Sequence, residues 1–222
     1  MGFRSMAARG FSGSRPEMAD PLEAPALIAF DFDGTLTVRD SFTAFLAWRA
    51  GPLRYAIGCL RLAPAAIGYL FHRNRGRIKA AAVREFLKGA PRDQLEAQAR
   101  AFAEYAAPKL FRPDALVAWR RWRAKGATTI IVSASPDLVV APFARGLGCD
   151  RLIASGIAFD VYDRATGALA GANCRGPEKV RRLKEAYGED VRLTAAYGDT
   201  SGDREMLRIA DEKGYRVFRE RP

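Results

Sequence analysis

The sequence predicts an α/β protein, with a parallel sheet and a helical segment inserted after its first strand. Short apolar segments recur along the chain, as expected for buried parallel strands. Segments with helical spacing separate most of them. One long stretch shows helical patterns alone. We therefore expect a disordered tail at 1–24, a core at 25–38 and 113–222, and a helical insert at 39–112.

The first strand is expected at 26–30, where Ala-Leu-Ile-Ala-Phe runs into Asp31. Helices are then predicted at 40–50, 52–71, 77–88, 91–107 and 113–125, with Gly and Pro breaks in the second. Beyond them, strands are predicted at 128–132, 151–154, 157–162, 191–197 and 215–218, and helices at 136–145, 177–187 and 204–210. Ala165-Thr-Gly167 predicts the turn of a hairpin that continues through 168–170.

Charge is concentrated in the predicted insert. The 222-residue chain has a formal net charge of +11, and residues 38–113 hold 14 basic and 5 acidic side chains. Such a surplus attracts phosphates, anionic lipid or nucleic acid. A solvated basic face with no special purpose explains it equally well, and a nucleic-acid-binding protein is the less favoured alternative because no recognised binding motif accompanies the charge.

The spacing of the cysteines and the length of the apolar segments predict the cellular compartment of the protein. The three cysteines are scattered without a C-x-x-C pair, which favours a reducing cytoplasm. Residues 1–23 lack the apolar centre of a secretory signal. The apolar stretch 52–71 is interrupted by Arg54 and Arg61, and is too short between charges to span a bilayer. It is suited to lie on a membrane surface, which predicts a cytoplasmic protein with peripheral contact to the membrane.

Acidic pairs follow two of the predicted strands. Asp31 and Asp33 follow the first strand, and Asp199 and Asp203 lie in a glycine-containing loop after the strand at 191–197. The carboxyl ends of parallel strands meet at one edge of a sheet, so Asp31, Asp33 and Asp199 should converge there. Asx-turns or helix caps would explain each pair separately. Together they predict a site for a hard divalent cation, Mg²⁺ being the natural choice.

Two further residues are suited to bind a phosphoryl group. Ser133 follows the strand at 128–132, and a helix N-terminus comes shortly after it. Lys179 lies in the first turn of a predicted helix, where the helix dipole disfavours a cation unless an anion is near. An N-cap serine and a surface lysine are the ordinary alternatives.

In order, these residues form the motifs Asp31-x-Asp33-Gly-Thr35, Ser133, Lys179 and Gly198-Asp199-x-x-x-Asp203. The pattern resembles the haloacid dehalogenase superfamily of phosphotransferases over about residues 27–218. The insert resembles the cap of its phosphoserine-phosphatase-like branch (subfamily IB). Cys174-Arg-Gly-Pro-Glu-Lys179 and the segment 197–203 look most like a bacterial group that includes phosphatidylglycerophosphatase C. The resemblance implies a Rossmann-like parallel sheet with a helical cap.

The resemblance also implies a mechanism. Asp31 would be the nucleophile that forms an aspartyl-phosphate, and Asp33 the general acid and then the general base. Mg²⁺ would be held by Asp31, the Asp33 carbonyl and Asp199. The phosphoryl oxygens would be bound by Ser133, Ala134, Lys179 and Gly34, with Asp203 in a supporting role.

The substrate is less closely defined by the resemblance. Dehalogenases of this superfamily lack the second aspartate, so Asp33 favours phosphate ester hydrolysis. Gly202 stands where phosphoserine phosphatases usually carry Asn, whereas Asp40 falls where they place an acidic residue for the substrate ammonium. The apolar, basic insert favours a phospholipid headgroup phosphate such as phosphatidylglycerophosphate, at an anionic membrane surface. A small phosphorylated metabolite such as phosphoserine is the alternative, and transfer to an alcohol in place of water also stays open.

Overall fold

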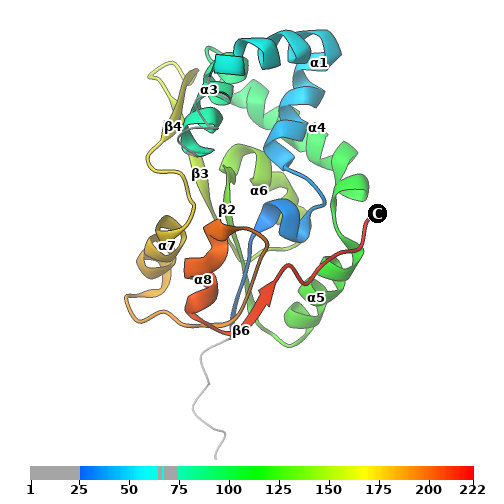
Figure 1. Cartoon of the computed structure of the whole chain (residues 1–222), viewed down its shortest axis with the longest axis vertical. Helices are drawn as coiled ribbons and strands as arrows, with labels where there is room; N and C mark the ends of the chain where they lie inside the picture. The colour runs from blue at the N-terminus through cyan, green and yellow to red at the C-terminus, as the bar shows by residue number, and fades with distance from the viewer. Residues whose placement is uncertain (1–25, 65–66, 68–74) are drawn as a thin grey trace, which may run out of the picture.

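A six-stranded sheet with the order β4-β3-β2-β1-β5-β6 forms the centre of the molecule (Figure 1). The computed structural model describes residues 26–64, 67 and 75–222, so the expected tail at 1–24 lies outside the described residues. Within them, the strands are β1 (Leu27–Phe30), β2 (Thr128–Pro136), β3 (Arg151–Phe159), β4 (Ala165–Ala170), β5 (Leu193–Gly198) and β6 (Ala210–Tyr215). Neighbouring strands are parallel except β4, which runs antiparallel to β3. The predicted α/β class is confirmed.

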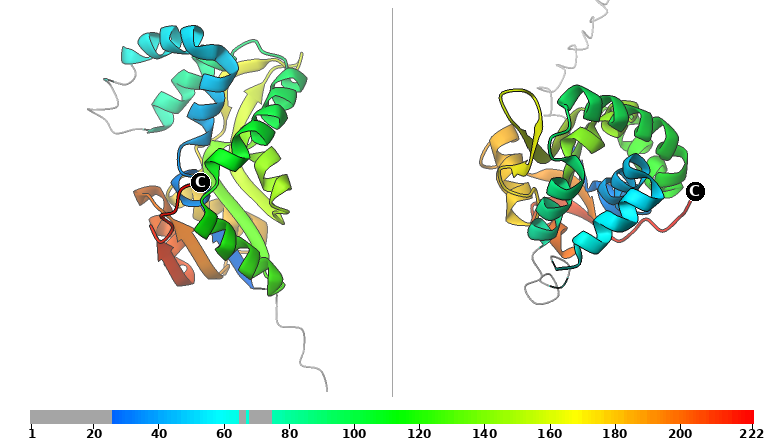
Figure 2. Two further views of the ribbon diagram at one scale, coloured as in Figure 1. Left: turned by 90° about the vertical axis from the view of Figure 1, so that its right-hand side faces the viewer. Right: turned by 90° about the horizontal axis from the view of Figure 1, so that it is seen from above.

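Helices cover both faces of this sheet. The α-helices of the described residues are α1 (Ser41–Arg61), α3 (Arg75–Leu87), α4 (Arg92–Leu110), α5 (Pro113–Ala124), α6 (Asp137–Gly146), α7 (Pro177–Tyr187) and α8 (Arg204–Arg208). Helices α5 and α6 pack on one face, and α7 and α8 on the other. Helices α1, α3 and α4 lie between β1 and α5 in the chain and stand toward one end of the sheet, where α3 packs on β4 and α4 packs on α6 (Figure 2).

The alternation of side chains along β1 joins the two halves of the core. Ile28 and Phe30 point into the cluster under α5 and α6, while Ala29 points into the cluster under α7 and α8, and all three are fully buried. The ring of Phe30 stacks on Tyr197 of β5 at 4.6 Å between centroids. Each large apolar side chain buried in this way contributes about 1.5–3 kcal/mol, which fixes the strand that precedes Asp31.

Helix α1 is kinked where two separate helices are predicted. Gly51 has φ of 73° and Pro52 follows it, so the chain bends but continues as a helix. The second half then crosses the top of the molecule in Figure 1. The last part of the helix predicted at 52–71 lies outside the described residues. Among the helices that the structure describes, none is both long and apolar enough to cross a bilayer.

The hairpin is confirmed, but its turn lies earlier than predicted. β3 is one strand rather than two, and the chain turns at 160–164, where the Asp160 carboxylate accepts hydrogen bonds from the amides of Tyr162 and Arg164. Gly167, which motivated the prediction of a turn, lies inside β4. A Cβ there would lie 3.1 Å from the Arg84 Cα of α3, so this glycine permits close packing of α3 on β4.

The last strand lies earlier than predicted. The helix predicted at 204–210 is confirmed as α8, although it ends at Arg208, whereas the strand predicted at 215–218 is wrong in its bounds, because the last strand is β6 (Ala210–Tyr215). Ala210 of β6 pairs with Leu193 of β5, at the edge of the sheet. Edge strands carry charged side chains on their exposed positions. Because residues 211–213 are Asp-Glu-Lys, β6 lacks the apolar pattern from which the other strands were predicted.

Candidate functional site

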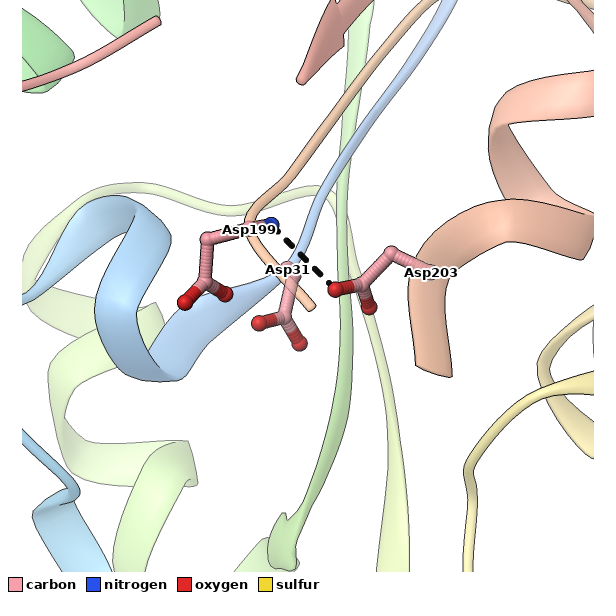
Figure 3. Close-up of side chains that lie close together, drawn as sticks. All are labelled: Asp31, Asp199 and Asp203. Atoms are coloured by element: carbon pink, nitrogen blue, oxygen red, sulfur yellow. Dashed lines mark hydrogen bonds between the residues drawn. The ribbon is translucent and has the colours of Figure 1, made fainter. Parts of the chain in front are cut away.

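Three carboxylates converge at the carboxyl ends of the central strands. Asp31 follows β1 and Asp199 follows β5, its neighbour in the sheet, while Asp203 lies in the turn before α8. One carboxylate oxygen from each lies within 4.8 Å of the others. Figure 3 shows the three side chains pointing toward one another. Of the three aspartates predicted to converge, Asp31 and Asp199 do so. Asp203 completes the cluster in place of Asp33, which lines the same cavity.

Lys179 is buried between two of these carboxylates. Its ammonium donates to Asp31 Oδ1 at 2.6 Å, to Asp203 Oδ1 at 2.7 Å and to the Val132 carbonyl at 2.6 Å. All three ammonium protons therefore have acceptors. Burial opposes the charge on Lys179, but the two carboxylates outweigh it and raise its pKa. The lysine remains charged and fixes the orientation of Asp31.

The carboxylate of Asp203 mainly binds groups of the loop that follows β5. Its Oδ2 accepts hydrogen bonds from the amides of Asp199 at 3.2 Å and Thr200 at 2.8 Å, and from the Thr200 hydroxyl at 2.9 Å. Its Oδ1 accepts from Lys179. Burial acts to raise the pKa of Asp203, but Lys179 and the bonds from Thr200 hold it below the usual value. Asp203 therefore positions Asp199 and Lys179.

Gly34 leaves room for the Asp199 carboxylate. A Cβ at position 34 would lie 2.4 Å from Asp199 Oδ2, and Gly34 has φ of 84°. The Thr35 hydroxyl donates to Asp199 Oδ1 at 3.3 Å. Burial raises the pKa of Asp199, and the nearby Asp203 raises it further. The motif after β1 thus provides space and a hydrogen bond for the carboxylate of the distant loop.

Asp33 lies beside the start of α1. Its Oδ1 accepts a hydrogen bond from the Ser41 amide at 2.7 Å. Burial, and after it the negative charge of Asp40, raise the pKa of Asp33 to about 6, against the effect of the Ser135 and Ser41 hydroxyls. Asp40 is the N-cap of α1 and accepts from the Thr43 amide at 2.6 Å. A carboxyl group with this pKa exchanges protons near neutral pH.

The segment at the end of β2 differs in part from expectation. Ser133 is fully buried, and its hydroxyl accepts a hydrogen bond from the Ser135 amide at 3.0 Å. Ala134 lines the cavity described below, whereas Ser133 is not among the lining residues. The Ala134 carbonyl accepts from the Lys79 ammonium at 2.5 Å. Lys79 belongs to α3, and the sequence offered no motif that would single it out.

A cavity of about 680 Å³ opens above these groups. Its floor is polar and includes Asp31, Asp33, Asp199 and Lys179. The wall formed by the inserted helices is mostly apolar and consists of Phe42, Leu46, Tyr55, Cys59, Leu62, Ile78, Ala82 and Phe86. Asp40, Gly34 and Lys79 also line it. The site therefore combines a charged floor with a wall suited to an apolar group.

Arg175 is a second lining residue that the sequence analysis missed. Its guanidinium donates to the hydroxyls of Thr200 at 3.4 Å and Ser201 at 3.0 Å. A Cβ on Gly202 would lie 2.5 Å from the guanidinium, so the glycine makes room for the arginine. The departure noted at Gly202 therefore has a steric reason. No local sequence pattern joins the two residues, because only the folded chain brings them together.

Burial also shifts the pKa of Asp31. Its pKa is raised to about 7 because burial, and further the charge of Asp203, outweigh the opposing attraction of Lys179. Five aspartates line the cavity, and their negative charge is only partly balanced by the four basic side chains that also line it, Lys179, Lys79, Arg39 and Arg175. Carboxylate oxygens are the ligands that Mg²⁺ prefers, and a dication would relieve this repulsion. The donor set fits such an ion, and Gly34 leaves room for the Asp199 carboxylate to belong to it.

Comparison with known proteins identifies relatives over the whole chain. Residues 28–208 match the model of a family described as haloacid dehalogenase-like hydrolase. Protein CicA of Caulobacter vibrioides, from strain NA1000 / CB15N and from strain ATCC 19089 / CIP 103742 / CB 15, is 64% identical over 222 residues. The match covers 100% of this chain and 100% of CicA.

Several solved structures share the fold. A protein of unknown function from Bordetella pertussis Tohama I superposes with a TM-score of 0.69 at 21% identity, covering 84% of this chain and 87% of that one. A substrate-bound phosphoserine phosphatase has a TM-score of 0.59 at 22% identity, and the match covers 87% of this chain and 86% of that one. A phospho-aspartyl intermediate analogue of phosphoserine phosphatase has a TM-score of 0.57 at 21% identity, and the match covers 86% of each chain. At such identities the likeness establishes the fold alone, but the family match spans most of the chain: the protein belongs to the haloacid dehalogenase-like hydrolases.

Proposed function

We propose that this chain is a Mg²⁺-dependent phosphomonoester hydrolase that works through an aspartyl-phosphate at Asp31. The observation that carries the proposal is the setting of the Asp31 carboxylate. Lys179 binds its Oδ1, and within the described part of the chain no hydrogen bond is made to its Oδ2. One oxygen is thereby fixed while the other is available to a phosphorus atom in the cavity.

In the first step, Asp31 attacks phosphorus and the ester bond to the leaving alkoxide breaks. Asp33 donates its proton to that alkoxide. Its pKa of about 6 keeps a useful fraction protonated near neutral pH, which an ordinary aspartate would not do. The phosphoryl group is then bound to Asp31 as a mixed anhydride. One of the structures of the same fold is of a phospho-aspartyl intermediate analogue, which supports this choice of intermediate.

In the second step, Asp33 removes a proton from water, and the water oxygen attacks phosphorus. The bond from phosphorus to Asp31 breaks, and inorganic phosphate leaves. The two steps return Asp31 to the carboxylate and Asp33 to the acid, so the residues are ready for another substrate. Splitting the reaction in this way replaces one difficult displacement with two easier ones.

The remaining groups offset the charge of the phosphoryl oxygens. Lys179 and Lys79 supply positive charge, and the residues expected to bind phosphate lie near the end of β2 (Ser133 and Ala134) and in the turn after β1 (Gly34). Arg175 lies in the wall of the same cavity. Phosphoryl transfer depends mainly on positioning and charge stabilisation, so these groups suit the task.

Asp31, the Asp33 carbonyl and Asp199 would hold the Mg²⁺ ion, with Asp203 fixing the loop that carries Asp199. The ion would supply charge stabilisation to the phosphoryl oxygens. Support comes from the clustered carboxylate oxygens and from Gly34, which leaves room for the Asp199 carboxylate among them.

For the substrate, we favour a phospholipid headgroup phosphate such as phosphatidylglycerophosphate, with the helices of 39–112 acting as a cap that selects it. The apolar wall of the cavity supports a leaving group with an apolar part. A small metabolite such as phosphoserine is the second candidate. Asp40 lies in the cavity wall, where it could bind an ammonium group, and phosphoserine phosphatases share the fold.

A substrate panel tests the proposal. The purified chain would be assayed with Mg²⁺ on phosphatidylglycerophosphate in detergent micelles, on phosphoserine and on p-nitrophenyl phosphate. We expect release of phosphate, loss of activity in EDTA and recovery on adding Mg²⁺. Faster hydrolysis of the lipid than of phosphoserine supports the favoured substrate. No phosphate release from any of the three would contradict the proposed function.

A further inference from the structure

The second half of α1 carries an exposed apolar face. Leu53, Ile57 and Leu60 recur at spacings of four and three residues, so they lie on one side of the helix. Leu53 is 76% exposed and Leu60 is 74% exposed, with Ile57 at 39%. Scattered apolar side chains are common on protein surfaces, but three along one helical face form a continuous stripe. We call these three residues the outer face of α1.

The opposite side of the same helix accounts for its packing. Tyr55, Cys59 and Leu62 follow the same spacing half a turn away and line the cavity above Asp31. Between the two faces, Gly58 is buried and lies against the ring of Phe86 from α3. The helix is therefore a wall of the cavity, and the outer face is not needed to attach that wall to the rest of the protein.

Positive charge borders the outer face on one side. Arg54 and Arg61 lie there, with 42% and 65% of their side chains exposed, and both pair with Glu85, at 2.8 and 3.3 Å. One carboxylate cannot neutralise two guanidinium groups. A partner for this surface must therefore be anionic, and it must accept apolar side chains beneath its charged layer.

We propose that the outer face of α1 binds the protein to the surface of an anionic lipid bilayer. A helix that lies in the plane of the interface buries apolar side chains below the headgroups while its basic residues contact anionic lipid. The outer face has this arrangement. Because the reverse side of α1 lines the cavity, the bound protein would hold the cavity about one helix diameter, roughly 10 Å, from the headgroups. The inference deepens the proposed function by stating where a lipid substrate would be met.

Vesicle flotation with the full-length protein tests the proposal. Vesicles of phosphatidylcholine with about one-third phosphatidylglycerol would be compared with vesicles of phosphatidylcholine alone. We expect binding to the anionic vesicles, weaker binding as salt is raised because exposed charges are screened, and little binding to the neutral ones. The double variant L53Q/L60Q should bind at least about tenfold more weakly, since two leucines no longer enter the acyl region.

The matched control is V117Q/V217Q. These valines are 62% and 50% exposed, and Val117 lies on α5, far from the second half of α1 (Figure 1). The control should bind vesicles as the unaltered protein does. Glutamine is a good helix former, so L53Q/L60Q should keep its fold. Circular dichroism checks this, and hydrolysis of p-nitrophenyl phosphate should persist because neither leucine lines the cavity.

Three results would overturn the proposal. The first is no binding of the unaltered protein to anionic vesicles. The second is equal binding by L53Q/L60Q, which would assign the contact to another part of the chain. The third is that the unaltered protein forms a dimer in sedimentation equilibrium, that L53Q/L60Q abolishes the dimer, and that neither protein binds vesicles. The outer face would then be a contact between two copies of the chain. Vesicle binding needs no catalysis, so its failure leaves the substrate panel unaffected, and a negative panel leaves the vesicle result standing.

Discussion

The ammonium of Lys179 lies 2.6 Å from Asp31 Oδ1, deep in the protein and 148 residues away along the chain. The lysine is 1% exposed and the aspartate side chain 9%. In this setting an unpaired charge is costly, so each partner requires the other. The same ammonium also holds Asp203. The contact therefore links the loops after β1 and β5 to the start of α7, and it sets the position of the proposed nucleophile.

Replacing Lys179 tests the stability of this arrangement. Lys179→Met leaves two buried carboxylates without their cation, and we expect the free energy of unfolding to fall by about 3–5 kcal/mol. Activity should also be lost. Urea unfolding measures the change. Lys184→Met is the matched control, because Lys184 pairs with Glu189 at 3.2 Å on the surface and its loss should cost less than about 1 kcal/mol. Equal effects of the two changes would contradict the account.

Asp33→Asn tests the acid and base roles through the leaving group. For an alkyl phosphate, kcat should fall by about 10²–10⁴-fold because the alkoxide needs a proton. With p-nitrophenyl phosphate the leaving nitrophenolate needs none, so the first step should survive while hydrolysis of the intermediate is slow. Stopped-flow absorbance should then show a burst of nitrophenol followed by slow turnover. An equal loss for both substrates, with no burst, would exclude the role of Asp33 as acid.

Asp40→Asn tests the electrostatic coupling between Asp40 and Asp33. The negative charge of Asp40 raises the pKa of Asp33, after burial. Removing that charge favours the ionised form of Asp33, so its pKa should fall. The acid form would then be lost at lower pH, and the alkaline limb of kcat/KM should move to lower pH. Asparagine is as good an N-cap as aspartate, so α1 should be unaffected. An unchanged or upward-shifted limb in the pH profile would refute the coupling.

Gly34→Ala tests the space beside Asp199. The new Cβ would displace the Asp199 carboxylate, and the Mg²⁺ concentration for half-maximal activity should rise by roughly 10–100-fold, as for other groups that orient metal ligands. Gly126→Ala is the matched control. Gly126 also has positive φ, 74°, but nothing lies within 4 Å of its Cβ position. Backbone strain without displacement of Asp199 should leave the Mg²⁺ requirement unchanged. The same shift in both variants would assign the effect to strain.

The sheet and the carboxylate cluster could be predicted from the sequence because both depend on local patterns. Buried strands such as β1 are apolar throughout, and Asp31 and Asp199 are conspicuous because charged residues directly after such strands are unusual. Parallel strands bring those positions to one edge whatever the details of packing. For this reason the predicted meeting of the two aspartates did not depend on accurate element boundaries.

The missed features depend on contacts between distant segments. Lys79 reaches Ala134 from α3, and Arg175 occupies the space left by Gly202. Neither relationship leaves a pattern in a single sequence. Gly167 was misread for the same reason, because its purpose is the approach of α3 to β4 and not a turn. Ser133 was predicted to follow a strand, but it lies inside β2, and its burial depends on packing that the sequence does not display.

Trapping of the intermediate tests the central claim most directly. The protein would be quenched with borohydride during turnover of p-nitrophenyl phosphate, which reduces an aspartyl-phosphate to homoserine, and its peptides analysed by mass spectrometry. We predict homoserine at position 31, more of it in Asp33→Asn, and none in Asp31→Asn. Continued turnover with an unmodified Asp31 in both the unaltered protein and Asp33→Asn, or homoserine at a different aspartate, would contradict the account.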